Sequence, residues 1–172
     1  MPNLLPIDSS SRRAGSQGRA LADIVGARRR RSGGTVTTRD ATALSDALIA
    51  ELQATETLLI STPIYSFAPP AALKLWIDQI VHIDRKFAFD GATFKGLAAR
   101  GRAVLCLADG AGGCGPGGAM QAADFLAPYL RFLMTFLGID NVRTVAVERA
   151  TAHETTLSTN LAAARDAARA AA

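Results

Sequence analysis

This chain has few cysteines, few aromatic residues and no long apolar run. Cys106 and Cys114 fit no metal-binding or redox spacing, so we expect two free thiols in a reducing compartment and no metal site. No apolar segment approaches the ~20 residues needed to span a bilayer, and the amino terminus lacks the basic-then-apolar order of a signal peptide. These absences predict a cytoplasmic protein with no membrane partner.

Acidic residues are too few to balance the basic ones, and the net charge is +4. Four consecutive arginines at positions 28–31 would suit a polyanion, but no aromatic residue is interleaved with them to stack on bases. They directly precede Ser32, Gly33 and Gly34, where a helix is expected to end, and cations favour a helix carboxyl end. We therefore predict a solvated helix end and no nucleic-acid partner.

The familiar nucleotide motifs are also missing, because the chain has neither a Gly-Lys-Ser/Thr triplet nor a GxGxxG after its first apolar run. In their place, residues 8–19 form a serine-rich loop between a predicted strand at 3–7 and a predicted helix. Small residues and a helix amino terminus together can cradle a phosphate. Serines are equally common as plain helix caps, so this loop alone leaves both interpretations open.

A second loop indicates more specifically which kind of ligand is bound. The apolar run 57–61 predicts a buried strand, and Leu73, Trp76, Ile77 and Ile80 predict the buried face of a helix that starts at residue 71. Between them lies a loop with an aromatic residue, hydroxyls and prolines. Ligands of parallel α/β sheets bind at the carboxyl ends of strands, so this loop suits a flat, hydrogen-bonding ring.

Strand and helix patterns alternate along the whole chain, which predicts an α/β fold formed by one domain over residues 1–172. The predicted sheet is parallel, five-stranded and covered by helices on both faces. Segment 82–97 carries Phe87 and Phe89 in alternation and predicts a small irregular or hairpin excursion. Six of the ten residues at 109–118 are glycine, which is compatible with a binding loop or with a flexible connector. The predicted strands are 3–7, 35–38, 57–61, 102–107 and 142–147; the predicted helices are 16–29, one from about 42, 71–82, 120–137 and 154–170.

In this order, the motifs resemble the flavodoxin-like FMN-dependent NADH:quinone and azo-compound reductases, the azoreductase family, over nearly the whole chain. The resemblance rests on Ser9-Ser10 with Ser16-Gln17, on Pro63-Ile64-Tyr65-Ser66-Phe67, on Pro70-Ala71-Ala72-Leu73-Lys74, and on Ala127-Pro128-Tyr129-Leu130. The chain departs from the family at Gly18 and Ser66, in a short segment after Asp40, and in the glycine-rich run that follows Ala108.

The resemblance implies strand order 2-1-3-4-5, bound FMN, NADH or NADPH as hydride donor, ping-pong transfer to a quinone or azo-aromatic substrate, and a homodimer. It assigns no catalytic side chain, since His82 and His153 are isolated. The implied phosphate residues are Ser10, Ser16, Gln17 and Gly18; the ring residues are Pro63, Ile64, Tyr65, Ser66 and Phe67. The implied pyrimidine-edge residues are Asp109, Gly110, Ala111 and Gly112, and Phe87 and Phe89 would line the substrate pocket.

The departures leave alternatives open. The short segment after Asp40 favours a repurposed biosynthetic relative that acts on a bulky aromatic metabolite with weak or no FMN binding. A one-electron flavodoxin-type carrier would be acidic in order to dock basic partners, and the basic charge of this chain counts against it. A nucleic-acid-binding domain is supported only by the arginine run.

Overall fold

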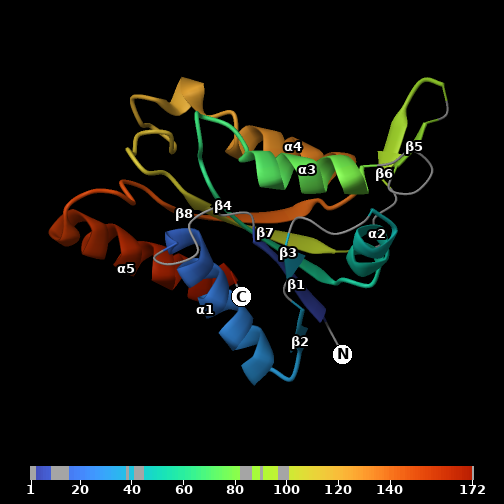
Figure 1. The fold of residues 1–172 in the computed structure, drawn as a ribbon, viewed down its shortest axis with the longest axis horizontal. Helices are drawn as coiled ribbons and strands as arrows, with labels where there is room; N and C mark the ends of the chain where they lie inside the picture. Colours follow the sequence, from blue (N-terminus) through green and yellow to red (C-terminus); the bar gives the residue numbers. More distant parts are fainter. Residues whose placement is uncertain are drawn as a thin grey trace.

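The computed structural model describes residues 3–8, 16–37, 39–40, 45–81, 87–89, 91–96 and 101–171. Its centre is a parallel sheet in the order β2-β1-β4-β7-β8, with β3 as a further partner of β1 (Figure 1). This order confirms the predicted arrangement of five successive strands. The strands are β1 (Asn3–Asp8), β2 (Thr35–Val36), β3 (Arg39–Asp40), β4 (Thr57–Pro63), β7 (Arg102–Ala108) and β8 (Asn141–Val147).

Helices cover both faces of this sheet, as predicted (Figure 1). One core packs α1 and α5 against the sheet through residues such as Leu21, Val25 and Leu161. The other core packs α2, α3 and α4 against the opposite face, with Trp76 and Leu130 at its centre. The helices are α1 (Gln17–Arg31), α2 (Ser45–Gln53), α3 (Ala71–Ile80), α4 (Ala127–Phe136) and α5 (Glu154–Ala171).

Two predicted elements differ from the observed ones. The second strand was predicted over residues 35–38; the observed β2 covers Thr35–Val36, and β3 (Arg39–Asp40), which lies beyond the predicted range, also pairs with β1. The predicted helix over 120–137 was too long, because only a 3-10 turn, η1 (Gln121–Ala123), precedes α4. Asp124 Oδ1 accepts the N–H groups of Leu126 and Ala127, and Pro128 lies in the first turn of α4. These are ordinary signals of a helix start, and they place it at Ala127.

Pro6 lies inside β1, where a missing N–H normally breaks a strand ladder. The register with β4 runs through Pro6 without a bulge. Leu4 O accepts the N–H of Thr37. Because the backbone groups of alternate residues in a strand point to the same side, those of Leu4 and Pro6 both point toward β2 and β3. The missing N–H of Pro6 therefore lies on the side of β1 where β2 ends at Val36 and β3 begins at Arg39.

The arginine run forms the last turn of α1, as predicted. Ser32 caps the helix, and Gly33 follows in a left-handed conformation with φ of 80°. Arg29 pairs with Glu56 across 3.0 Å. These contacts lie at the helix carboxyl end, where positive charge is favourable.

The hairpin of β5 (Phe87–Phe89) and β6 (Phe94–Gly96) confirms the predicted excursion. It packs beside the carboxyl end of α4, with the rings of Phe94 and Phe136 5.5 Å apart. A Cβ on Gly96 would lie 2.2 Å from the nitrogen of Gly138, so the two backbones touch there. Because α4 ends just before β8 begins, the hairpin lies near the amino ends of the strands, away from the loops at their carboxyl ends (Figure 1).

Candidate functional site

The loops after β4 and β7 meet at the carboxyl edge of the sheet. The N–H of Ile64 donates to Ala108 O at 2.9 Å, which extends the pairing of the two strands beyond their ends. Further on, the N–H of Phe125 donates to Phe67 O, also at 2.9 Å. The structure therefore brings the predicted ring loop and the segment around the glycine-rich loop together. The start of α1 follows β1, which ends at this same edge.

At that start, Ser16 caps α1, and its Oγ accepts the N–H of Arg19 at 3.4 Å. Gly18 is buried against β4, where a Cβ would lie 2.8 Å from Ser61 Oγ. Packing thus explains why glycine replaces the serine that relatives were expected to carry. First-turn N–H groups, including those of Gln17 and Gly18, have no acceptor within a helix. The predicted phosphate residue Ser10 lies outside the described residues.

The ring loop contains a tight turn over residues 65–68, which we call the Tyr65 turn. The N–H of Tyr65 donates to Ala68 O at 3.2 Å, and the N–H of Ala68 donates to Tyr65 O at 3.0 Å. Between them, Ser66 and Phe67 have positive φ values of 48° and 68°, which L-residues rarely adopt. Their N–H groups have no acceptor within the described part of the chain. The side chains of Tyr65 and Phe67 are 42% and 45% exposed, so neither belongs to the core.

The glycine-rich loop, residues 109–118, is held by two carboxylates. Asp109 is only 8% exposed, and its Oδ2 accepts the N–H of Cys114 at 3.1 Å. Glu148, which follows β8, accepts the N–H groups of Gly113 at 3.2 Å and Gly115 at 2.8 Å. The expectation of a flexible connector is therefore disfavoured. The Asp109 carboxylate, predicted to lie at the cofactor, accepts a hydrogen bond inside the loop.

The first part of this loop presents backbone donors. The N–H groups of Gly110, Ala111 and Gly112 have no acceptor among the residues that the structure describes. These residues are half-buried or exposed, and Gly112 has a φ of 83° that suits glycine. They lie directly after β7, beside the Tyr65 turn. A ligand edge rich in acceptors would satisfy them.

A cavity of about 500 Å³ lies behind the glycine-rich loop, between it, α4 and β8. Its apolar floor is formed by Ile64, Leu107, Ala127 and Ala146. Cys114 faces it and is buried; desolvation, a hydrogen bond to Asp109 and nearby carboxylates raise the pKa of this thiol to about 11. The further polar lining comes from Asp109, Gln121, Asp124, Arg131, Thr144 and Glu148.

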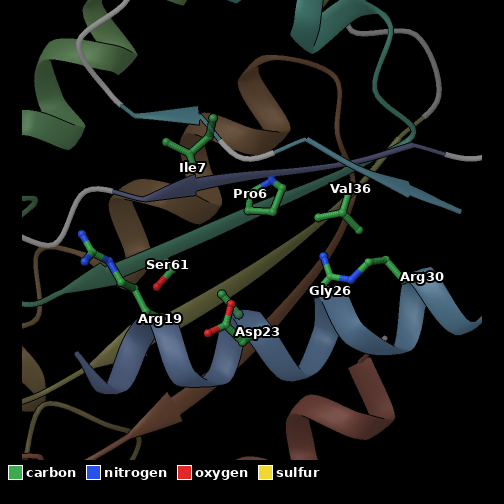
Figure 2. Close-up of a pocket in the computed structure, with 9 residues that line it drawn as sticks. Pro6, Ile7, Arg19, Asp23, Gly26, Arg30, Val36 and Ser61 are labelled. Carbon is green, nitrogen blue, oxygen red and sulfur yellow. The ribbon is translucent and has the colours of Figure 1, made fainter. Parts of the chain in front are cut away.

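A smaller cavity of about 230 Å³ lies between α1 and the edge of the sheet. Figure 2 shows Arg19 and Ser61 at one end, Arg30 and Val36 at the other, and Asp23 between them. Pro6 contributes to its lining. Since β2 is only two residues long, this side of α1 is left partly uncovered.

The three loops together suit a ligand with an anionic group and a flat polar ring. Helix-terminal donors suit the anion, and the Tyr65 turn offers exposed aromatic side chains. The hairpin that carries Phe87 and Phe89 packs at the carboxyl end of α4, through Phe94 and Phe136. Glu148 was not identified from the sequence, where an isolated glutamate after a strand carries no signal. The described residues contain no group of His, Cys, Asp and Glu suited to a metal ion.

Comparison with known proteins decides the family. A family profile described as flavodoxin-like fold matches residues 2–172. This chain belongs to that family. It is 38% identical over 174 residues to an FMN-dependent NADH:quinone oxidoreductase of Xanthobacter autotrophicus, covering 83% of this chain and 84% of the relative. It is 35% identical over 182 residues to FMN-dependent NADH:quinone oxidoreductase 1 of Jannaschia sp., covering 87% and 89%.

Solved structures show the same fold. An azoreductase from Bacillus anthracis superposes with a TM-score of 0.86 at 17% identity, covering 99% of both chains. An FMN-dependent NADH-azoreductase from the same species, in complex with FMN, gives a TM-score of 0.85 at 16% identity over 99% of this chain and 98% of that one. The predicted relation of this chain to the flavodoxin-like FMN-dependent NADH:quinone oxidoreductases is confirmed, and the azoreductase structures show that it shares their fold. None of the described helices has the length and apolar character needed to cross a membrane.

Proposed function

We propose that this protein is an FMN-dependent oxidoreductase that passes hydride from NADH or NADPH through FMN to quinone or azo-aromatic substrates. One observation carries the proposal: Ser66, Phe67 and residues 110–112 present backbone N–H groups without acceptors in the described chain, in the loops that follow the neighbouring strands β4 and β7. The named function of the relative that is 38% identical supports the same activity.

The residues present fit FMN. Ser16 and the first turn of α1 would hold the phosphate, the Tyr65 turn would contact the ring, and residues 110–112 would donate to its polar edge. Bound FMN would supply two-electron hydride chemistry between the nicotinamide and the substrate, which we propose react in two successive, ping-pong half-reactions. The chain orients the ring, and its fixed N–H dipoles stabilise negative charge near residues 110–112.

A homodimer is part of this proposal. Leu75 on α3 and Phe132 on α4 are 51% and 68% exposed, which leaves large apolar side chains on the outer helix layer. The hairpin that carries Phe87 and Phe89 packs at the carboxyl end of α4, and in this proposal a partner subunit brings its own hairpin to the pocket. Light scattering at micromolar concentration is expected to give the mass of a dimer. A monomer would contradict this part, and the cytoplasmic location stays a prediction from sequence.

The visible spectrum of the purified protein after incubation with FMN tests the function. We expect flavin absorption bands that persist through desalting and that bleach when NADH or NADPH is added without oxygen. Quinone addition should restore the bands, and initial rates at several quinone concentrations should give the parallel lines of a ping-pong mechanism. A colourless protein that FMN cannot reconstitute would instead favour the repurposed relative.

Replacing Ser16 tests the phosphate position. Aspartate caps helices as well as serine does, so Ser16→Asp should leave the stability of the FMN-free protein within about 1 kcal/mol. Its negative charge would face the phosphate and weaken FMN binding by about 2–3 kcal/mol. Ser16→Ala, which removes the cap without adding charge, is the control and should lose less affinity. FMN titration by fluorescence measures both, and unchanged affinity in Ser16→Asp would remove this helix end from the site.

A further inference from the structure

The carboxylate of Glu148, which lines the cavity beside α4, holds the glycine-rich loop by two hydrogen bonds. Its Oε1 accepts the N–H of Gly115 at 2.8 Å, and its Oε2 accepts the N–H of Gly113 at 3.2 Å. Each oxygen of one carboxylate thus holds a different backbone donor of the loop. The backbone of Glu148 is held in turn, because Asn160 Nδ2 donates to its carbonyl at 2.8 Å. Charge-assisted hydrogen bonds of this kind are about twice as strong as neutral ones.

This contact leaves no room for a side chain at residue 115. A Cβ on Gly115 would lie 2.0 Å from Glu148 Oε1. Gly115 has no positive φ, so the backbone alone would accept alanine there. The requirement for glycine at this position therefore comes from the carboxylate that closes the loop.

The N–H groups offered to the ligand lie between two anchors. At one side, Thr151 Oγ1 and N–H donate to Gly110 O, at 2.8 and 3.2 Å. At the other side, the N–H of Gly113 donates to Glu148. Residues 110–112 therefore lie between a hydrogen-bonded carbonyl at Gly110 and a hydrogen-bonded N–H at Gly113. Their orientation therefore depends on Glu148, although its carboxylate lines the cavity behind the loop.

We propose that Glu148 is a positioning residue for the flavin ring. It fixes the loop so that the N–H groups of Gly110, Ala111 and Gly112 face the acceptor edge of the ring, and it does not touch the ring itself. The inference rests on the proposed function, because it assigns a flavin to the edge that these donors face. It predicts that weakening the contact lowers flavin affinity and makes the flavin midpoint potential more negative, since fewer donors stabilise charge on the reduced ring.

The experiment compares Glu148→Gln with Glu154→Gln, the same change at an exposed residue in the first turn of α5. Hydrogen exchange of the FMN-free proteins should show faster exchange at Gly113 and Gly115 in Glu148→Gln alone. FMN affinity should fall about 10- to 100-fold in that variant, as expected for losing one or two hydrogen bonds to a charged group. The control should keep wild-type affinity and potential.

Gly115→Ala tests the contact from the other side. We expect it to lower FMN affinity as Glu148→Gln does, because the new methyl group displaces the carboxylate. In a Glu148→Ala background the obstacle is gone, so adding Gly115→Ala should change affinity less than twofold. This cycle keeps the test informative if either single variant is poorly folded.

The possible results separate the two proposals. Wild-type protein that binds no FMN would overturn the proposed function, while the exchange measurements would still report on the loop. Wild-type protein that binds FMN, together with a Glu148→Gln protein of unchanged affinity and potential, would overturn the positioning role alone. The unfolded fraction of each variant can be measured by the fluorescence of the single tryptophan, Trp76. FMN affinity that falls only in proportion to this fraction would also overturn the positioning role.

Discussion

The Tyr65 turn and the glycine-rich loop lie at the same sheet edge, and both present backbone N–H donors. They differ in residue type and in the contacts that hold them. The Tyr65 turn is short, contains no glycine, and places Ser66 and Phe67 at positive φ. It is closed by backbone hydrogen bonds between residues 65 and 68. The glycine-rich loop relieves backbone strain with glycine and is closed by the carboxylates of Asp109 and Glu148.

This difference separates two costs of exposing backbone donors. A left-handed L-residue costs about 1–2 kcal/mol of local strain. Glycine avoids that strain but loses more conformational entropy on folding, about 0.5–1 kcal/mol per residue relative to alanine. A long glycine-rich loop therefore needs side-chain anchors, whereas a tight turn is ordered by its own backbone. Substitutions in the Tyr65 turn should therefore act mainly through backbone strain, and substitutions in the glycine-rich loop mainly through chain entropy and the contacts that anchor it.

Gly118→Ala should have the largest effect and would break the glycine-rich loop. A Cβ at residue 118 would lie 2.2 Å from Gly113 O, which is backbone and cannot swing away. We expect a loss of about 3 kcal/mol or a rearranged loop, measured by urea unfolding and FMN titration. Gly117→Ala is the matched control, because residue 117 has φ of 78° and open space, and should cost only about 1 kcal/mol. Equal effects would mean that the loop has no fixed packing.

The thiol of Cys114 tests whether the glycine-rich loop stays closed. A thiolate is the reactive form, and a pKa raised from 9.0 to about 11 lowers its fraction at neutral pH by about 100-fold. In a Cys106→Ser background, labelling by a disulfide reagent at pH 8 should be slower than in urea by at least about that factor. The rate should rise with pH until about 11, since deprotonation increases through that range. Labelling as fast as in the unfolded chain would show an open loop.

Tyr65→Ala probes the other side of the comparison. Because this side chain is 42% exposed, its loss should change the stability of the FMN-free protein by no more than about 1 kcal/mol. Loss of ring stacking should lower FMN affinity about tenfold. Tyr65→Phe keeps the ring and should keep the affinity. A large stability loss with normal FMN binding per folded molecule would instead assign Tyr65 a structural role.

Ser66→Gly should have the smallest effect and sharpen the comparison. Glycine relieves the strain of φ at 48° but adds entropy to the unfolded chain, so we expect a net gain of about 0.5 kcal/mol. Ser66→Ala retains the strain and should give no gain. Thermal unfolding of the FMN-free proteins measures the difference. A destabilised Ser66→Gly would mean that the serine side chain itself orders the turn.

Local patterns were sufficient for most elements and insufficient where distant side chains decide. The apolar runs predicted β4 and β7 closely, because strands buried on both faces need continuous apolar residues. The helix predicted from residue 120 was too long, because apolar spacing continues upstream of its true start. That start is set by Asp124, whose side chain accepts the N–H of Leu126, and by Pro128 in the first turn of α4. The short β3, beyond the predicted second strand, depends on its pairing with β1, which no local pattern encodes.

Local sequence patterns predict the order of strands and helices along the chain and identify three site loops, two by their serine or aromatic residues and the third by its glycines. Periodicity, capping residues and backbone freedom are local properties, so they can be read from neighbouring residues. The folded arrangement alone shows that Glu148 closes the glycine-rich loop, across 33 and 35 residues of chain. It also decided that the hairpin packs at the opposite end of α4 from that loop. Both depend on which strands lie side by side, and that is set by the packing of the whole sheet.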